Sequence, residues 1–280
     1  MTAAERRTPP PTGDRLYPLR TAARPRGAPS RGPAPAPARR RAPRTIIQII
    51  FPEEPSSVTV LPPPRATTGV LPVRLLTRVE CGEELPALVW RAGAGWRMIS
   101  SAVLGGGIGE RTWVLNAQVS HGYRRTDPEA HLAGLAHDAG MRGPGVGLMT
   151  AADVRRYGHA HDGGVEAVAT AGLGVRGWAA APAPGSAAPP EPGTINIVVA
   201  VPAPLTDAAL VNAVSTATEA KVQALLDAGH DCSGTPTDAI CVAARTPRPG
   251  DQPDSFAGPR SLWGARLARA VHCAVRAAAG

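Results

Sequence analysis

The chain has 280 residues, of which 43% are apolar, so it is long enough for one large domain or two small ones with a substantial core. Its net charge of +8 suggests a nucleic-acid-binding protein, but residues 1–65 alone carry 12 arginines against four acidic residues. Residues 66–280 carry 18 basic and 18 acidic residues, and this neutral balance removes the argument for a nucleic-acid-binding domain.

Residues 1–67 form a basic extension rich in Pro, Ala and Arg. This composition buries too little apolar surface to offset the entropy of the chain, so we expect disorder, with a short apolar stretch at residues 46–51. Such an extension could bind RNA or a membrane surface weakly, but its composition favours a solvated segment. We therefore expect no nucleic-acid partner.

The sequence gives no signal for export or for membrane insertion. No apolar run follows the N-terminal arginines, so neither a secretory nor a twin-arginine signal is complete. No stretch approaches the ~20 apolar residues that a membrane helix needs. The cysteines show no C-x-x-C pair and no zinc-ligand spacing, which favours a reduced, cytoplasmic protein. They are Cys81, Cys232, Cys241 and Cys273.

Apolar periodicity and capping residues place strands and helices along residues 68–280. In the first half we expect strands at residues 70–80, 87–91, 96–104, 113–119, 146–150 and 165–171, and a helix from Asp127 and Pro128 to about residue 139. In the second half we expect a loop at residues 178–191, strands at 195–201 and 239–243, and helices at 206–228 and 261–278.

Strands that alternate with helices indicate an α/β or α+β fold. Several consecutive strands precede the first helix, which argues against a doubly wound sheet. We predict a single domain over residues 68–280, with a mixed β-sheet and packed helices.

The longest expected helix has well-defined ends and unusual faces. Thr206 is a good N-cap, and Gly229 supplies the left-handed residue past the last turn. One side of the helix is a polar stripe of Ala208, Asn212, Ser215, Thr216, Glu219 and Gln223. The opposite side holds Leu210, Val211, Val214, Val222 and Leu225, with Lys221 among them.

Lys221 is the only lysine in the chain, which otherwise uses 29 arginines. Glu219 is two residues away, so the two side chains point in different directions and cannot pair. The lysine could simply extend past its apolar neighbours to solvent. However, ammonium and guanidinium differ in pKa and shape, so a lone lysine in an arginine-rich chain is a candidate functional group.

Three loops combine glycine with hydroxyl or acidic residues. The glycines at 105–107 follow a strand, but their spacing matches no nucleotide motif and indicates only close approach of the backbone. Thr150 and Asp153 end an apolar run, where they could cap the next element or face a ligand. Residues 234–238 (Gly-Thr-Pro-Thr-Asp) lie between the long helix and a strand, where they could likewise cap or face a cleft.

The histidines do not indicate a metal site. His159 and His161 would share a face of a strand, but no third ligand is evident and glycines surround them, so we expect a surface loop. His272 on the last helix is expected to be structural. No G-x-S-x-G motif and no Cys/His pairing is present.

Several motifs, in this order, resemble the adenosylcobinamide amidohydrolase family of cobamide salvage. They are Ser-Ser-Ala-x-x-Gly-Gly-Gly at residues 100–107, Asn116, Gly-Val-Gly-Leu-Met-Thr-Ala-Ala-Asp-Val at 145–154, Ala-Thr-Ala-Gly-Leu at 169–173, Gly-Thr-Ile-Asn-Ile at 193–197, Thr-Glu-Ala-Lys at 218–221, Gly-Thr-Pro-Thr-Asp at 234–238 and Gly-Pro-Arg-Ser at 258–261. The family often has glycine where this chain has Pro236, so this chain lacks the backbone N–H that a glycine would offer at that position.

The resemblance implies hydrolysis of the amide that joins aminopropanol to the corrin ring of adenosylcobinamide. The corrinoid is then the substrate, and no cofactor or metal is predicted. The implied catalytic candidates are Lys221, Glu219, Asp238, Asp153, Asn116 and Thr237. The implied substrate-binding candidates are Ser101, Gly105, Gly106, Gly107, Thr150, Thr194, Asn196, Asn212, Thr235 and Arg260.

Two questions about mechanism stay open at the level of sequence. A carboxylate of Asp238, Glu219 or Asp153 could activate water while Lys221 or Asn116 polarises the carbonyl, or else Thr235 or Thr237 could be the nucleophile. Self-cleavage to an N-terminal threonine, at residues 193–194 or 234–235, is a further option. A different class, a corrinoid-binding or delivery protein without catalysis, also fits the motifs.

Overall fold

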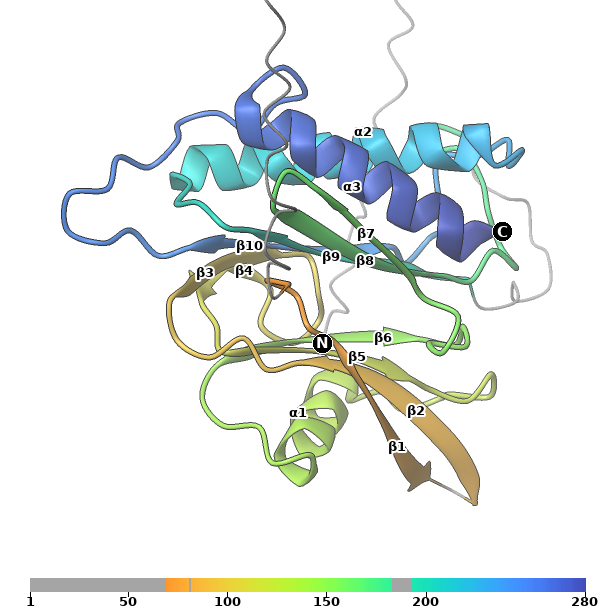
Figure 1. The fold of residues 1–280 in the computed structure, drawn as a ribbon. Coiled ribbons are helices and arrows are strands. Elements are labelled where there is room, and N and C mark those ends of the chain that lie inside the picture. The colour runs from red at the N-terminus through yellow and green to blue at the C-terminus, as the bar shows by residue number, and fades with distance from the viewer. Residues whose placement is uncertain (1–68, 81, 183–192) are drawn as a thin grey trace, which may run out of the picture. The chain divides into compact units, whose positions relative to one another are not determined.

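The computed structural model describes residues 69–80, 82–182 and 193–280. The expected extension at residues 1–67, its apolar stretch, Cys81 and most of the expected loop at 178–191 lie outside the described residues. The strands are β1 (Arg74–Glu80), β2 (Glu83–Trp90), β3 (Trp96–Ser100), β4 (Gly107–Glu110), β5 (Trp113–Gln118), β6 (Gly145–Thr150), β7 (Gly158–Asp162), β8 (Val165–Ala171), β9 (Ile195–Val201) and β10 (Ala239–Arg245) (Figure 1). The helices are α1 (Pro128–Asp138), α2 (Asp207–Asp227) and α3 (Leu262–Ala279).

The strands form two sheets. One has four strands in the order β1-β2-β5-β6, and the other has six in the order β4-β3-β10-β9-β8-β7. Both are mixed, because β5 pairs with β6 and β9 pairs with β10 in parallel, whereas the other pairs are antiparallel. The predicted mixed α/β architecture is confirmed, but the sequence analysis predicted one sheet, and local patterns carry no information on which sheet a strand joins.

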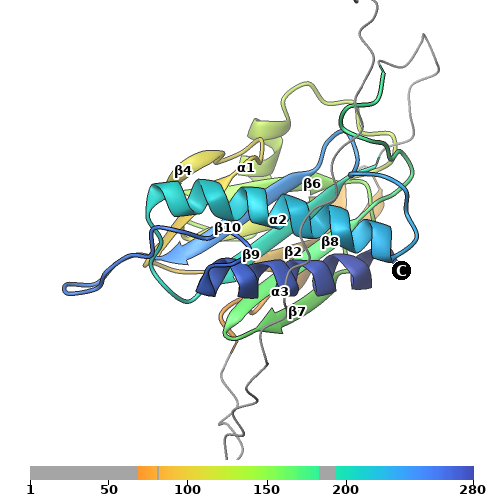
Figure 2. The same ribbon diagram turned by 90° about the horizontal axis from the view of Figure 1, so that it is seen from above.

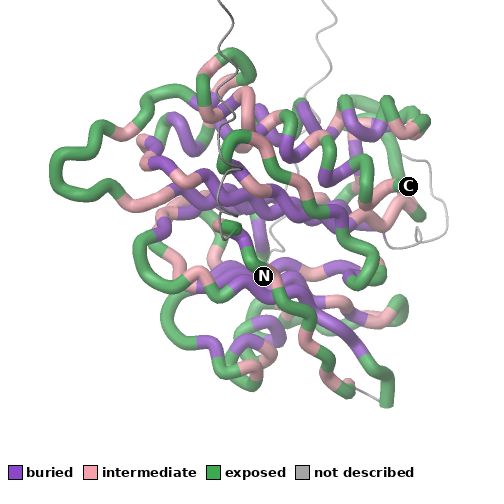
Figure 3. The backbone as a smooth tube through the Cα atoms, in the orientation of Figure 1, coloured by how far each residue is buried: buried purple, intermediate pink, exposed green. Residues whose placement is uncertain are grey.

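The elements stack in four layers, with α1 on the four-stranded sheet and with α2 and α3 on the six-stranded sheet (Figure 1). Seen from above, α2 and α3 lie side by side across the strands (Figure 2). The buried backbone follows the strands of both sheets (Figure 3). The buried apolar residues form three separate clusters, one under α2 and α3, one between the sheets and one under α1. None of the described helices has the length and apolar character to cross a membrane.

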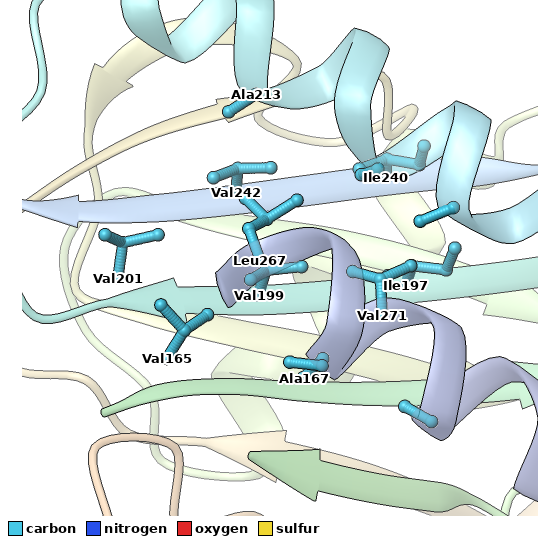
Figure 4. Packing of buried hydrophobic residues seen from close by; sticks show 14 of the residues in the cluster. Val165, Ala167, Ile197, Val199, Val201, Ala213, Ile240, Val242, Leu267 and Val271 are labelled. Atoms are coloured by element: carbon cyan, nitrogen blue, oxygen red, sulfur yellow. The ribbon is translucent and has the colours of Figure 1, made fainter. Parts of the chain in front are cut away.

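The apolar core on the helix side of the six-stranded sheet forms between β9 and the two long helices, α2 and α3. Every residue of β9 is buried, as its β-branched sequence predicts, and its Val199 and Val201 face the helices (Figure 4). Thr206 caps α2 by accepting a hydrogen bond from the backbone N–H of Ala209 at 3.2 Å. Gly229 has a φ of +83°, so both predicted helix ends are confirmed.

The buried face of α2 differs from the predicted apolar side. It is centred on small residues, which let the helix lie close to the sheet, and Val211 on the predicted apolar side is 54% exposed. The buried alanines of α2 are Ala209, Ala213, Ala217, Ala220 and Ala224.

Three local predictions were wrong. The strand expected at residues 96–104 ends at Ser100, because the Ser100 hydroxyl accepts the N–H of Ala102 and turns the chain. Asp127 precedes α1 but does not cap it, since its carboxylate pairs with Arg125 instead. The residues expected to form a histidine-bearing surface loop form β7, an edge strand paired with β8 alone.

Candidate active site

Two loops that precede parallel strands lie side by side at one end of the six-stranded sheet. Residues 193–194 lead into β9, and residues 234–238 lead into β10. Because β9 and β10 are parallel neighbours, with Asn196 opposite Ala239, their leading segments must meet. The C-terminal half of α2 lies against the same segments and supplies Lys221.

Asp238 is the centre of this group. Its Oδ1 accepts hydrogen bonds from the N–H of Ile195 at 2.9 Å and from the hydroxyl of Thr235 at 2.5 Å. Its Oδ2 accepts from the Lys221 ammonium at 2.5 Å and from the N–H of Thr235 at 3.1 Å. Four donors therefore occupy the carboxylate, which has about four acceptor positions in all.

The Lys221 side chain is only 8% exposed and points to Asp238 rather than to solvent. The alternative of a lysine that extends into water does not fit this geometry. Burial of an ammonium is costly unless it is paired and hydrogen-bonded, and Asp238 supplies that partner. Glu219 is exposed and lines a groove between α2 and α3, on a different side of the helix from Lys221.

Two threonine hydroxyls contact the carbonyl of Gly193, and a third contacts one of these two hydroxyls. Thr235 Oγ1 lies 2.9 Å and Thr237 Oγ1 lies 3.0 Å from that oxygen. Thr237 Oγ1 is also 2.6 Å from Thr194 Oγ1. Thr194 is buried and Thr237 is exposed, so the group extends from the ion pair to the surface.

A second polar group is buried between the two sheets. Asn116 of β5 donates from Nδ2 to Thr170 Oγ1 of β8 at 2.9 Å and accepts at Oδ1 from Asn196 Nδ2 of β9 at 2.8 Å. Asn196 Nδ2 also donates to the carbonyl of Met149 at 3.0 Å, while its Oδ1 is buried and has no hydrogen-bond partner among the described residues. Both ends of the Asn116 amide are thus used to join the sheets.

Ser101 and the triple glycine make structural contacts with neighbouring strands and loops. The hydroxyl of Ser101 accepts the N–H of Ile240 at 3.1 Å and so fastens the end of β3 to β10. Gly105 and Gly107 have φ values of +70° and +78°, which favour glycine. A side chain at Gly105 would collide with the carbonyl of Gly145, so the predicted close approach is to the backbone of β6. Gly106 is similarly crowded, against a carbonyl of its own loop.

In the described part of the chain, none of the remaining predicted residues is hydrogen-bonded to Lys221 or Asp238. Thr150 is buried and accepts the N–H of Ala152, and Asp153 is exposed and accepts the N–H of Arg155, so each is held in a local turn. Asn212 accepts the N–H of Ala257 near the start of α3. Arg260, in the turn before α3, is exposed.

The structure thus brings together Lys221, Asp238, Thr235, Thr237 and Thr194, with Asn196 and Asn116 behind them. Sequence reasoning missed three residues of this region, although each lies in a quoted motif: Gly193, Gly234 and Thr170. Gly193 contributes its carbonyl, Gly234 leaves room because it has no side chain, and Thr170 accepts a hydrogen bond from the other sheet. None of these contacts can be seen in a single sequence.

The described residues contain no group of three or more His, Cys, Asp or Glu side chains that could hold a metal ion. The cysteines among them are free, and Cys241 lies between the sheets, where burial raises the pKa of its thiol to about 12. That thiol is a core group rather than a nucleophile.

Comparison with known proteins decides the family. A family model described as adenosylcobinamide amidohydrolase matches residues 72–280. The chain belongs to the adenosylcobinamide amidohydrolase family. The matched region of this family member includes the whole Lys221–Asp238 group, so the resemblance seen in the motifs is confirmed.

Two relatives of that name support the same assignment. The chain is 32% identical over 183 residues to an adenosylcobinamide amidohydrolase of Methanosarcina mazei, which covers 63% of this chain and 87% of that protein. It is 42% identical over 86 residues to one of Halobacterium salinarum, covering 31% and 36% of the two chains. Among solved structures, the PH0078 protein of Pyrococcus horikoshii gives a TM-score of 0.43 at 12% identity, over 75% of this chain and 84% of that one.

Proposed function

We propose that this protein hydrolyses the amide that joins aminopropanol to the corrin ring of adenosylcobinamide. The products are adenosylcobyric acid and aminopropanol, so a scavenged incomplete corrinoid is returned to the biosynthetic route. Family membership supports the substrate and the reaction class. The observation that carries the chemistry is that Asp238 contacts both the Lys221 ammonium and the Thr235 hydroxyl, within the matched region.

The hydrogen bonds of Asp238 favour Thr235 over water as the nucleophile. A carboxylate that activates water needs a free acceptor position facing that water, and here four donors occupy both oxygens. Two of these donors, the Thr235 hydroxyl and the Lys221 ammonium, become nucleophiles after losing a proton. Attack by the amine would only replace one amide with another, whereas attack by the hydroxyl gives an ester that water can hydrolyse, so the arrangement favours Thr235. Thr237 touches a carbonyl and another hydroxyl, neither of which is a base.

The steps follow from these contacts. Thr235 Oγ attacks the amide carbonyl carbon while its proton moves to Asp238, and the Lys221 ammonium stabilises the negative charge that develops beside it. The C–N bond then breaks as Asp238 returns the proton to the departing aminopropanol nitrogen. Once Thr235 is esterified, its hydroxyl no longer donates to Asp238 Oδ1, so that acceptor position is free for a water molecule. The water attacks the Thr235 ester, gives its proton to Asp238 and releases the corrinoid acid, after which the proton returns to Thr235.

The first experiment incubates the purified protein with adenosylcobinamide and follows adenosylcobyric acid by chromatography and mass spectrometry, with and without a chelator. We expect product in both conditions from the wild-type protein. Thr235→Ala should lower turnover at least about a thousandfold, while Thr235→Ser should keep much of it. Thr237→Ala is the matched control, since it removes a neighbouring hydroxyl that does not contact Asp238, and should cost less than about tenfold.

Each failure has its own meaning. Full turnover by Thr235→Ala would contradict the threonine nucleophile and leave the reaction standing. Tight binding of adenosylcobinamide with no product would support a corrinoid carrier instead. Intact mass after an acid quench provides a further test, because the ester intermediate adds the mass of the corrinoid acyl group to the wild-type chain but not to Thr235→Ala.

A further inference from the structure

The segment after β8 is tied to the loop that carries the Thr235–Asp238 group. Gly177 donates its N–H to the carbonyl of Gly234 at 3.0 Å and accepts at its own carbonyl from the N–H of Ser233 at 3.0 Å. On the other side of Trp178, the N–H of Ala179 donates to Ser233 Oγ at 2.8 Å. The backbone on both sides of Trp178 is therefore fixed to residues 233–234.

This attachment places Trp178 next to the candidate active site. Gly234, the partner of Gly177, is in contact with the ion pair: a side chain at Gly234 would meet Asp238 Oδ2 and Lys221 Nζ. Trp178 therefore directly follows Gly177, which is hydrogen-bonded to the glycine that lies against the ion pair.

Trp178 also differs from the other tryptophans in its exposure. Its side chain is 45% exposed, whereas Trp90, Trp96 and Trp113 are buried and Trp263 is half-buried. No hydrogen bond of the Trp178 indole to another described residue is present. A large apolar ring held in water by a fixed backbone is typical of a binding surface, since little entropy is lost when it is covered.

We infer that Trp178 is a substrate-contacting residue whose indole packs on a face of the corrin ring and sets the affinity for the corrinoid. This inference rests on the proposed function. The corrin is a flat, conjugated, methyl-bearing macrocycle, which offers an apolar face to a flat aromatic side chain. Contact with that face places the amide chain at the ring edge beside Thr235.

The test compares Trp178→Leu and Trp178→Phe with Trp263→Phe as the matched control, because Trp263 lies at the start of α3, away from the Lys221–Asp238 group. Dissociation constants for adenosylcobinamide, KM and kcat are measured for each purified full-length variant, together with the melting temperature. We expect Trp178→Leu to raise the dissociation constant and KM about tenfold, as loss of aromatic stacking does elsewhere, with kcat within about twofold of wild type. Trp178→Phe should recover part of the affinity, and Trp263→Phe should bind like wild type.

An unchanged dissociation constant and KM in Trp178→Leu, with a wild-type protein that binds and hydrolyses adenosylcobinamide, would overturn the inference alone. A large fall in kcat and melting temperature that Trp178→Phe does not restore would also overturn it, since that result indicates a structural role. A wild-type protein that neither binds nor hydrolyses adenosylcobinamide would overturn the proposed function itself.

Discussion

Gly234 is the residue on which the geometry of Asp238 and Lys221 depends most directly. Its φ of +149° is one that residues with side chains rarely adopt, and an added Cβ would press on both charged groups. We expect Gly234→Ala to abolish more than about 99% of turnover, because it displaces the ion pair by steric contact. The measurement is kcat/KM on adenosylcobinamide, with folding checked by circular dichroism.

Gly229→Ala is the matched control for that variant. Gly229 also has a positive φ, of +83°, but an added Cβ there meets nothing within 4 Å. It should therefore lose about 1–2 kcal/mol of stability and keep its turnover. Equal losses of activity in the two variants would show that backbone strain, not contact with the ion pair, explains the effect of Gly234→Ala.

The ammonium of Lys221 should not be replaceable by a guanidinium. Lys221→Arg introduces a larger planar group into a site where the side chain is only 8% exposed, so we expect turnover to fall at least about tenfold. Lys221→Met removes the charge, leaves Asp238 buried without its cation, and should cost about 3–5 kcal/mol of stability as well as activity. Chemical denaturation and steady-state kinetics separate the two effects. Full turnover by Lys221→Arg would refute the significance of the lone lysine.

At the residue scale the sequence singled out Lys221 and the motif that holds Asp238, and the structure pairs these two side chains. It could not choose between Thr235 and Thr237, because both lie in one motif and differ only in which oxygen each hydroxyl meets. It also gave Asn116 a possible catalytic role, whereas its amide bonds to residues 54 and 80 positions away. These hydrogen-bond partners are brought together by the pairing of distant strands, which a local sequence pattern does not predict.

At the scale of elements, β9 and α2 were predicted well for different reasons. A run of β-branched residues that is buried on both faces has few alternatives to a central strand, and Thr206 and Gly229 are strong helix-end signals. The strand β7 was missed because glycines lie at its start and directly after its end, so its sequence resembled an exposed turn. The assignment of strands to two sheets depends on long-range pairing and was not predictable from the sequence.

The Asn116–Asn196 hydrogen bond joins the two sheets, and its strength can be measured. We expect Asn116→Ala and Asn196→Ala each to cost about 1–3 kcal/mol, since each leaves a buried polar partner unsatisfied. The double variant should cost less than the sum of the two, with a coupling of at least about 0.5 kcal/mol. Urea unfolding of the wild type and the three variants measures this cycle. Strictly additive losses would show that the two amides do not stabilise the fold as a pair.

At the scale of the whole molecule, the boundary between extension and domain can be tested by truncation. Glu166 of β8 accepts the backbone N–H groups of Val70 and Leu71 at 2.7 and 3.1 Å, and the Leu71 side chain is fully buried between the sheets. We expect deletion of residues 1–67 to leave turnover and melting temperature near those of the full chain. Deletion of residues 1–72 should remove these contacts and lower stability by about 2–4 kcal/mol.

Leu71→Ala in the full-length chain is the control for the longer deletion. It removes the buried side chain but keeps the backbone contacts to Glu166, and should cost about 2–4 kcal/mol by itself. Equal melting temperatures for the two truncated proteins would place the start of the domain after residue 72. Loss of turnover on deletion of residues 1–67 alone would instead assign a catalytic contribution to the extension.

Because the only lysine is buried, its rate of chemical labelling measures local opening of the fold around it. An amine-reactive reagent finds only two amines in this chain, the α-amino group and Lys221. Because the Lys221 ammonium is covered and paired with Asp238, acylation there must wait until the end of α2 separates from the loop before β10. The rate at which Lys221 is labelled, with the α-amino group as an internal standard, therefore measures how often this part of the molecule opens.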